Sequence, residues 1–267
     1  MRAVFIGALL GIVPTARGDG SVTPEARPEF DAVVAAYRHL SSYENHGELS
    51  ITATIDGKPT HRAWSFAFRS HRPDQFALDA GAVRLMSDGK TMLTVLVPTK
   101  RYWAEPAPKR LSVAALAEGP AGAMALGGPA RSPALAILQL LLEDDPAKAL
   151  LEGDFVVTRA DDREQKGKKL HVLVFTPPTG PALRMFIDPD THLVQRITLI
   201  GESKPPVGAA PDLEVAWDAG AISIEALAPE RFAVVPPAGF QETSPLQAAE
   251  KKDEPKAPKA GADEPKE

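Results

Sequence analysis

SDGKTMLTVLVPTKRYW, residues 87–103, combines a tight turn at Asp88-Gly89, a strand, a second turn and an aromatic pair. An antiparallel strand with one wet face normally alternates apolar and polar side chains. This strand does not alternate, because Thr94 is its only polar break. Its apolar residues are Met92, Leu93, Val95, Leu96 and Val97. We therefore expect both of its faces to be covered, and the rest of the chain must supply the second cover.

Strand signals continue on either side of this stretch. ELSITATIDGKP, residues 48–59, alternates apolar and polar residues and ends in an Asp56-Gly57 turn, which is typical of a hairpin. AWSFAFRS, residues 63–70, returns with three aromatic side chains on one face. A late hairpin, ALRMFIDPDTHLVQRITLIG, turns at residues 188–190. These segments predict a sheet of antiparallel strands.

Two segments interrupt the strands with a helical pattern. Residues 23–40 carry an apolar stripe, with Thr23 as a candidate N-cap and Pro24 at the first helical position. Residues 132–151 contain the most apolar helix, which is apolar around most of its circumference and should be buried on more than one side. The fold class that we predict is mainly β (α+β). It is an incomplete antiparallel β-barrel, or one curved sheet, with helices covering the concave face.

This arrangement offers a cover for the strand at 91–98, namely the apolar helix of the insert. An apolar helix over an apolar concave sheet forms either a sealed core or a pocket for an apolar ligand. If it forms a pocket, we expect the sheet residues of the ligand cavity to be Leu49, Ile51, Trp64, Phe66, Phe68, Leu93 and Val95. The lid over them would carry Leu138, Leu141 and Leu142.

The composition excludes several kinds of function. The net charge of -5 gives no basic footprint for nucleic acid. The chain has no cysteine, so disulfides and thiolate nucleophiles are absent. The six histidines follow no metal-ligand spacing. DGKT at 88–91 is not a phosphate-binding loop, because it leads into a strand rather than a helix. The G-x-S-x-G motif of a serine nucleophile does not occur. We therefore expect a protein that is not an enzyme and that uses no cofactor or metal.

The two ends differ from the middle. Residues 1–18 have an early arginine, a short apolar run and small residues, the layout of a secretory signal peptide. Residues 244–267 are rich in Lys, Glu, Pro and Ala, which predicts a disordered charged tail. Between them, residues 22–243 are expected to form one domain. A cleaved signal would place the mature protein in the periplasm as a soluble protein.

Four motifs resemble, in the same order, landmarks of the LolA-like periplasmic lipoprotein carriers. They are RPDQF at 72–76, SDGKTMLTVLVP at 87–98, FIDPDTHLVQRITL at 186–199 and RFAVVPPAGF at 231–240. The resemblance spans roughly residues 28–240. The longer, Ala/Gly/Pro-rich segment 105–150 and the charged tail depart from the carriers and look more like a less characterised branch of the superfamily.

The resemblance implies an incomplete barrel whose helices act as a lid over an apolar cavity. In the carriers that cavity takes the acyl chains of outer-membrane lipoproteins, and the arginine matching Arg72 helps to control lid closure. For this chain the resemblance implies a monomeric periplasmic carrier whose cargo is a lipid or an acylated protein. The alternative is an envelope sensor or scaffold of the same fold that binds a membrane-protein partner.

Overall fold

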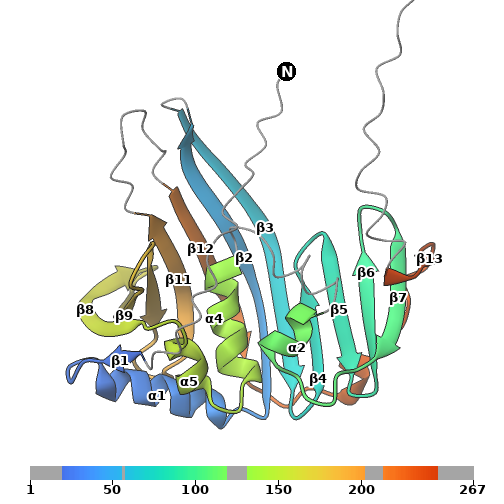
Figure 1. The fold of residues 1–267 in the computed structure, drawn as a ribbon, viewed down its shortest axis with the longest axis horizontal. Coiled ribbons are helices and arrows are strands. Elements are labelled where there is room, and N and C mark those ends of the chain that lie inside the picture. The colour runs from blue at the N-terminus through green and yellow to red at the C-terminus, as the bar shows by residue number, and fades with distance from the viewer. Residues whose placement is uncertain (1–19, 56–57, 119–130, 202–212, 246–267) are drawn as a thin grey trace, which may run out of the picture.

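The computed structural model describes residues 20–55, 58–118, 131–201 and 213–245. Their strands form one thirteen-stranded sheet in the order β1-β8-β9-β10-β11-β12-β2-β3-β4-β5-β6-β7-β13. The order begins at β1 (Ser21–Val22) and ends at β13 (Gln241–Glu242), so the curved sheet is not closed into a barrel. Figure 1 shows helices against one face of this sheet. The mainly β class and the incomplete barrel predicted from the sequence are confirmed.

The long β2–β3 hairpin is the centre of the sheet, and antiparallel neighbours extend from both of its sides. The central strands are β2 (Ser42–Ile55) and β3 (Lys58–His71). One side continues with β4 (Gln75–Asp79), β5 (Val83–Asp88), β6 (Thr91–Leu96) and β7 (Arg101–Pro106). The other side contains β12 (Leu213–Ser223), β11 (Val194–Gly201), β10 (Ala182–Ile187), β9 (Lys168–Thr176) and β8 (Val156–Gln165).

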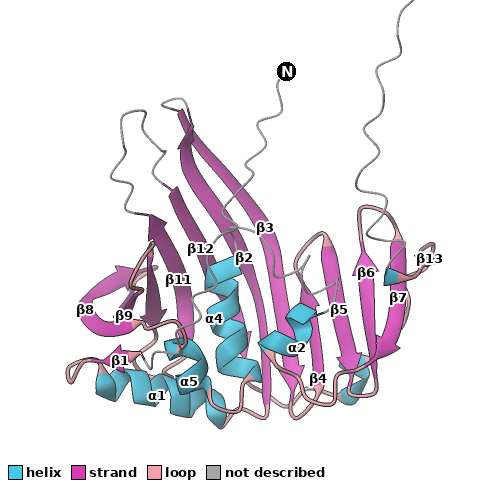
Figure 2. Ribbon diagram, viewed as in Figure 1, coloured by secondary structure: helices cyan, strands magenta, loops and turns pink. Residues whose placement is uncertain are grey.

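The helices lie on the concave face (Figure 2). They are α1 (Arg27–Arg38), α2 (Val113–Glu118), α4 (Arg131–Leu142) and α5 (Pro146–Leu151). The helix predicted at 23–40 begins at Arg27 instead of Pro24, with Ala26 as its N-cap residue and a proline in its first turn. Its predicted apolar stripe is the side that packs on the sheet, because Phe30, Val33, Val34 and Tyr37 are all buried.

Strand register assigns each side chain to one face. Residues directly opposite each other in paired strands share a face. Along one row the partners are Phe68, Leu78, Leu85, Thr94 and Trp103. This row lies on the concave face, since the rings of Phe68 and of Tyr37 on α1 both contact the ring of Tyr43. The neighbouring row runs through Arg69, Ala77, Met86, Leu93 and Ala104 and lies on the outer face.

Leu93 and Val95 therefore lie on the outer face, and the prediction that placed them with Phe66 and Phe68 is wrong. Both are fully buried, but they stand outside the core cluster that the helices and the concave face share. Successive side chains of a strand point to opposite faces, so an error of one residue reverses the assignment. The concave side of β6 carries Met92, Thr94 and Leu96 instead.

The second cover of β6 is the C-terminal strap, which we define as residues 227–242. Its 3-10 turn η1 (Pro229–Phe232) contacts β4 and β5, and its end, β13, pairs with β7. The strap must therefore cross the outer face of β6. The prediction that α4 covers the strand at 91–98 is wrong, because α4 packs on β11 and β12.

The predicted signal peptide, residues 1–18, lies outside the described residues, as do residues 246–267 of the predicted tail. Within the described residues, none of the helices has the length and apolar character needed to cross a membrane.

Candidate functional site

The first candidate site is the concave face beneath α4. On the concave face, Phe66 and Phe68 of β3 are 1% exposed, and Leu49 of β2 is also buried. From α4, Leu138 and Leu141 are buried in the same cluster. These five residues of the predicted cavity are thus brought together by the fold. In this structure α4 occupies the space above the sheet, and whether that space also admits a ligand stays a prediction.

The apolar pattern of α4 explains its position. Leu135, Gln139 and Leu142 form the one partly exposed stripe, and the described residues between them are buried. Leu142 therefore lies on the more accessible side of the helix, although it still packs against the core cluster. The Gln139 amide donates to the Ala149 carbonyl of α5 at 3.1 Å. The Glu143 carboxylate after α4 accepts from the Val113 backbone N–H of α2 at 2.9 Å. The polar contacts of α4 thus join it to the neighbouring helices.

Arg72 lies where β3 ends, beside the C-terminal ends of α1 and α4. Its Nη2 donates to the Tyr37 carbonyl at 3.4 Å and to the Leu141 carbonyl at 3.3 Å. A cation is favourable at a helix C-terminus, where carbonyl groups lack partners within the helix. Burial lowers the pKa of Arg72 and the charge of Arg38 lowers it further. Arg72 thus ties the end of β3 to both helices, while its role in lid control stays a prediction.

The concave face is less well covered toward the far end of the β2–β3 hairpin. Trp64 pairs with Leu49 and is 41% exposed, and Leu213 on β12 is 37% exposed. Ile51, paired with Val215, is partly buried between them. Trp64 and Ile51 thus share the predicted face but form its accessible rim, unlike the buried Phe66 and Phe68.

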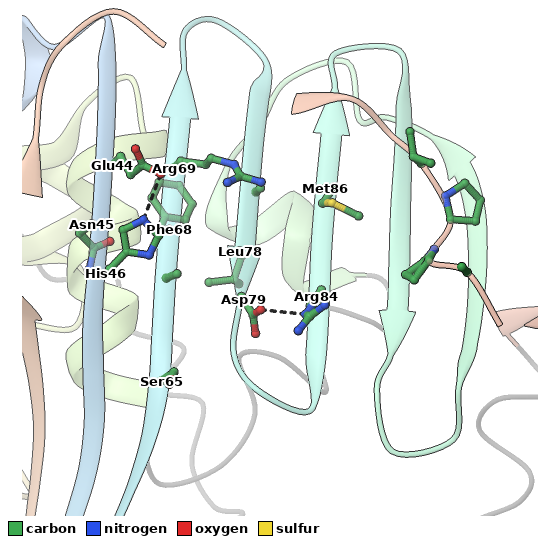
Figure 3. Close-up of a pocket in the computed structure, with 16 residues that line it drawn as sticks. Glu44, Asn45, His46, Ser65, Phe68, Arg69, Leu78, Asp79, Arg84 and Met86 are labelled. Atoms are coloured by element: carbon green, nitrogen blue, oxygen red, sulfur yellow. Dashed lines mark hydrogen bonds and ion pairs between the residues drawn. The ribbon is translucent and has the colours of Figure 1, made fainter. Parts of the chain in front are cut away.

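The second candidate site is a groove of about 700 Å³ on the outer face (Figure 3). Its floor is formed by β2 to β5, and the strap residues Val235–Ala238 also line it. Alanines at 67 and 77 lie among longer side chains on this face, which leaves a hollow between them. Val235 of the strap is 65% exposed at this groove. The floor and one border are therefore partly apolar.

Charged side chains surround the floor. Arg84 pairs with Asp79 at 2.7 Å, and Arg231 of the strap pairs with Glu44. His46 also reaches Glu44, at 3.1 Å (Figure 3). Arg69 differs from these residues, because its buried Nε has no hydrogen-bond partner within the described part of the chain. Burial lowers the pKa of Arg69 and the nearby positive charge of Arg231 lowers it further, while the carboxylates of Glu44 and Asp79 partly oppose this shift.

Sequence reasoning missed this groove. Arg69 could have been noticed as a charged residue beside three alternating aromatics, and RFAVVPPAGF as a segment too apolar for a free tail. The pattern could not place one against the other, because they lie far apart in the chain. Within the described residues, no cluster of three His, Cys, Asp or Glu side chains is arranged to hold a metal ion.

No family model and no curated protein matches the chain. Several solved structures are similar to it. An uncharacterized conserved protein from Thermus thermophilus has a TM-score of 0.45 at 8% identity, with 82% of this chain and 98% of that chain covered. A LolA superfamily protein from Nitrosomonas europaea has a TM-score of 0.29 at 8% identity, with 79% and 98% covered.

The complex of MucA and MucB from Pseudomonas aeruginosa gives a TM-score of 0.34 at 12% identity, with 79% of this chain and 61% of that chain covered. The LolA superfamily is thus represented among these structures. At these identities and TM-scores the likeness concerns the fold alone.

Proposed function

We propose that this protein is a periplasmic carrier that binds an acyl chain of a lipoprotein or lipid on its concave face, where α4 now packs. The observation that supports the proposal is how α4 is attached. The helix packs on the sheet through apolar side chains. Within the described residues, its one side-chain hydrogen bond to the sheet region is the bond that Arg72, at the end of β3, donates to the Leu141 carbonyl. A cover held in this way can be exchanged for another apolar group.

The energies of such an exchange are of similar size. Burying one Leu or Ile side chain stabilises a protein by about 1.5–3 kcal/mol, so Ile137, Leu138, Leu140 and Leu141 together contribute about 6–12 kcal/mol. Removing a chain of about 15 methylenes from water gains about 12 kcal/mol before ordering costs. An acyl chain could therefore replace α4 on the sheet at little net cost. The rim at Trp64 and Leu213 is an accessible apolar edge from which a chain could enter.

Arg72 would act as the latch in this exchange. Its two hydrogen bonds are long, at 3.3 and 3.4 Å, and bonds of this kind contribute about 1 kcal/mol each. They are weak enough to break when cargo arrives and specific enough to return α4 to one position.

The test begins with full-length protein produced in its native envelope. N-terminal sequencing should show that the signal peptide has been removed, and native mass spectrometry should show a copurified lipid. After delipidation, a fluorescent C16 fatty acid should bind. Phe66→Asp should abolish binding, since a charge in a dry site is costly, whereas Leu138→Glu on the displaced helix should weaken the packing of α4 and so tighten binding. Gln139→Glu, on the accessible stripe of the same helix, is the matched control and should bind normally.

The Arg72→Leu variant distinguishes a role of Arg72 in holding α4 closed from a role in the stability of the core. It should keep the fold and change the rate of probe release by about fivefold or more, because about 1–2 kcal/mol of lid closure is lost. An intact Met1 would contradict the periplasmic location. If wild-type protein holds no lipid and binds no acyl probe, the concave face is simply a core. A specific envelope partner that delipidated protein still binds would then favour the sensor or scaffold alternative.

A further inference from the structure

The outer groove carries an uncompensated positive charge. Three guanidinium groups, those of Arg69, Arg84 and Arg231, surround two carboxylates, those of Glu44 and Asp79. Each carboxylate already has an arginine partner, so the group of five carries one net positive charge. Arg69 is the guanidinium group that forms no salt bridge in the described residues, although the charges of Glu44 and Asp79 attract it, and its Nε is buried there without a hydrogen-bond partner. A desolvated donor that lacks a partner is costly unless a ligand satisfies it.

The hollow beside Arg69 is apolar. Ala67 and Ala77 form its floor, Met86 borders it on β5, and Val235 and Pro236 belong to the strap on the far side. Figure 3 shows Arg69 extending from β3 toward β4. The volume of about 700 Å³ lies within the range of small-molecule sites. One cation next to a small apolar surface is complementary to an anion with an apolar body.

We propose that this groove is a binding site for a small amphiphilic carboxylate, whose carboxylate group pairs with Arg69 while its apolar body lies on Ala67 and Ala77 beside the strap. The site is independent of the acyl site proposed under α4, because the two lie on opposite faces of the sheet. Arg69 suits a carboxylate, since a guanidinium can donate two parallel hydrogen bonds to it.

The residues that line the groove also limit the length and the charge of the ligand. A long acyl chain would have to cover the Asp79–Arg84 or Glu44–His46 pairs, and covering charged pairs with hydrocarbon is unfavourable. A bare anion would leave the hollow over the alanines empty. A short chain with a single charge satisfies both Arg69 and the floor, so octanoate is a suitable probe and the uncharged 1-octanol is its matched partner.

The experiment is a titration of the full chain with octanoate at pH 7 and low salt, followed by methyl NMR. Octanoate should shift the methyl signals of Ala67, Ala77 and Met86 in a saturable way and leave those of Leu138 unchanged. Arg69→Gln should weaken octanoate binding about tenfold or more, because a charge-assisted pair is lost. Arg69→Lys should weaken it less, and 1-octanol should bind no better to wild type than to Arg69→Gln.

Two further variants secure the result. Arg62→Gln makes the same change at an exposed position of β3 outside the groove and should leave binding unchanged. Asp79→Asn removes one negative charge from the groove and should tighten octanoate binding severalfold, a gain that misfolding could not produce. Shifts at Leu138 instead of the alanines, equal binding of 1-octanol, equally tight binding of acetate, or unchanged affinity in Arg69→Gln would each overturn the proposal. None of these outcomes depends on whether the C16 probe binds under α4.

Discussion

The strap should be a structural element as important as the helices, and Phe232 is the residue that tests this. Phe232 is 1% exposed, and its ring lies 6.4 Å from the ring of His71 on the outer face of β3. Truncating a buried phenylalanine to alanine costs about 3–5 kcal/mol, through lost burial and the cavity that remains. That is a large part of the roughly 5–15 kcal/mol that stabilises a typical domain.

The measurement is chemical unfolding of Phe232→Ala and wild type, with two probes to check for a single transition. The midpoint should fall without a change in the m-value. In a thermal scan, a loss of about 3–5 kcal/mol should lower Tm by about 6–20 °C in a domain of this size. Val235→Ala is the control, since Val235 is 65% exposed and its truncation should stay within about 0.5 kcal/mol.

A loss below about 1 kcal/mol in Phe232→Ala would refute the reasoning, because a buried phenylalanine should cost several times that amount. It would mean that the strap rests loosely on the sheet and that something else keeps Leu93 and Val95 dry. An equal effect of Phe232→Ala and Val235→Ala would lead to the same conclusion.

Two further predictions concern the β5–β6 turn and the tail. The Asp88 carboxylate accepts the backbone N–H groups of Thr91 and Lys90 at 2.8 Å, which lowers its pKa, the bond from Thr91 having the larger effect. The stability from this lowered pKa is present above the unfolded value of about 3.9 and is lost as the pH falls through the folded value. The difference in free energy of unfolding between wild type and Asp88→Asn should thus be full at about pH 7 and shrink below about pH 4, and a constant difference across the acid range would disprove the mechanism. Removal of residues 247–267 should leave Tm unchanged, because that sequence has no apolar side chain larger than those of alanine and proline, and a clear fall in Tm would show that it docks.

Turns and hairpins could be predicted from the sequence because their signals are local. Asp88-Gly89 does join β5 to β6, with φ +90° at Gly89, and residues 188–190 do join β10 to β11. The faces of β3 could also be predicted, since its aromatics alternate with small or polar residues. β6 offered no such guide, because both of its faces are apolar. Its face was decided by register with β5, where Val95 lies opposite the exposed Arg84.

The candidate sites depend on contacts that no local pattern contains. Arg72 meets the Leu141 carbonyl only because β3 ends beside α4. The unpaired state of Arg69 depends on which carboxylates its neighbours occupy, and one of those neighbours, Arg231, comes from the distant strap. A strand pattern reveals that a residue faces outward, but charge balance in a groove requires the full set of partners.

The two covers of the sheet are attached in different ways, and this difference separates their functions. The strap is fixed by the backbone hydrogen bond from Gln241 to the Lys100 carbonyl at 2.9 Å and by the Arg231–Glu44 pair, and just after it Thr243 donates to the Tyr102 carbonyl at 2.8 Å. Removing it would break directional bonds that no apolar ligand could replace. The α4 helix meets the sheet through apolar contacts, which are non-directional, so a hydrocarbon chain can substitute for them. A ligand that displaces a cover should therefore act on the concave face. On the outer face a ligand is confined to the space that the strap leaves open, next to Arg69.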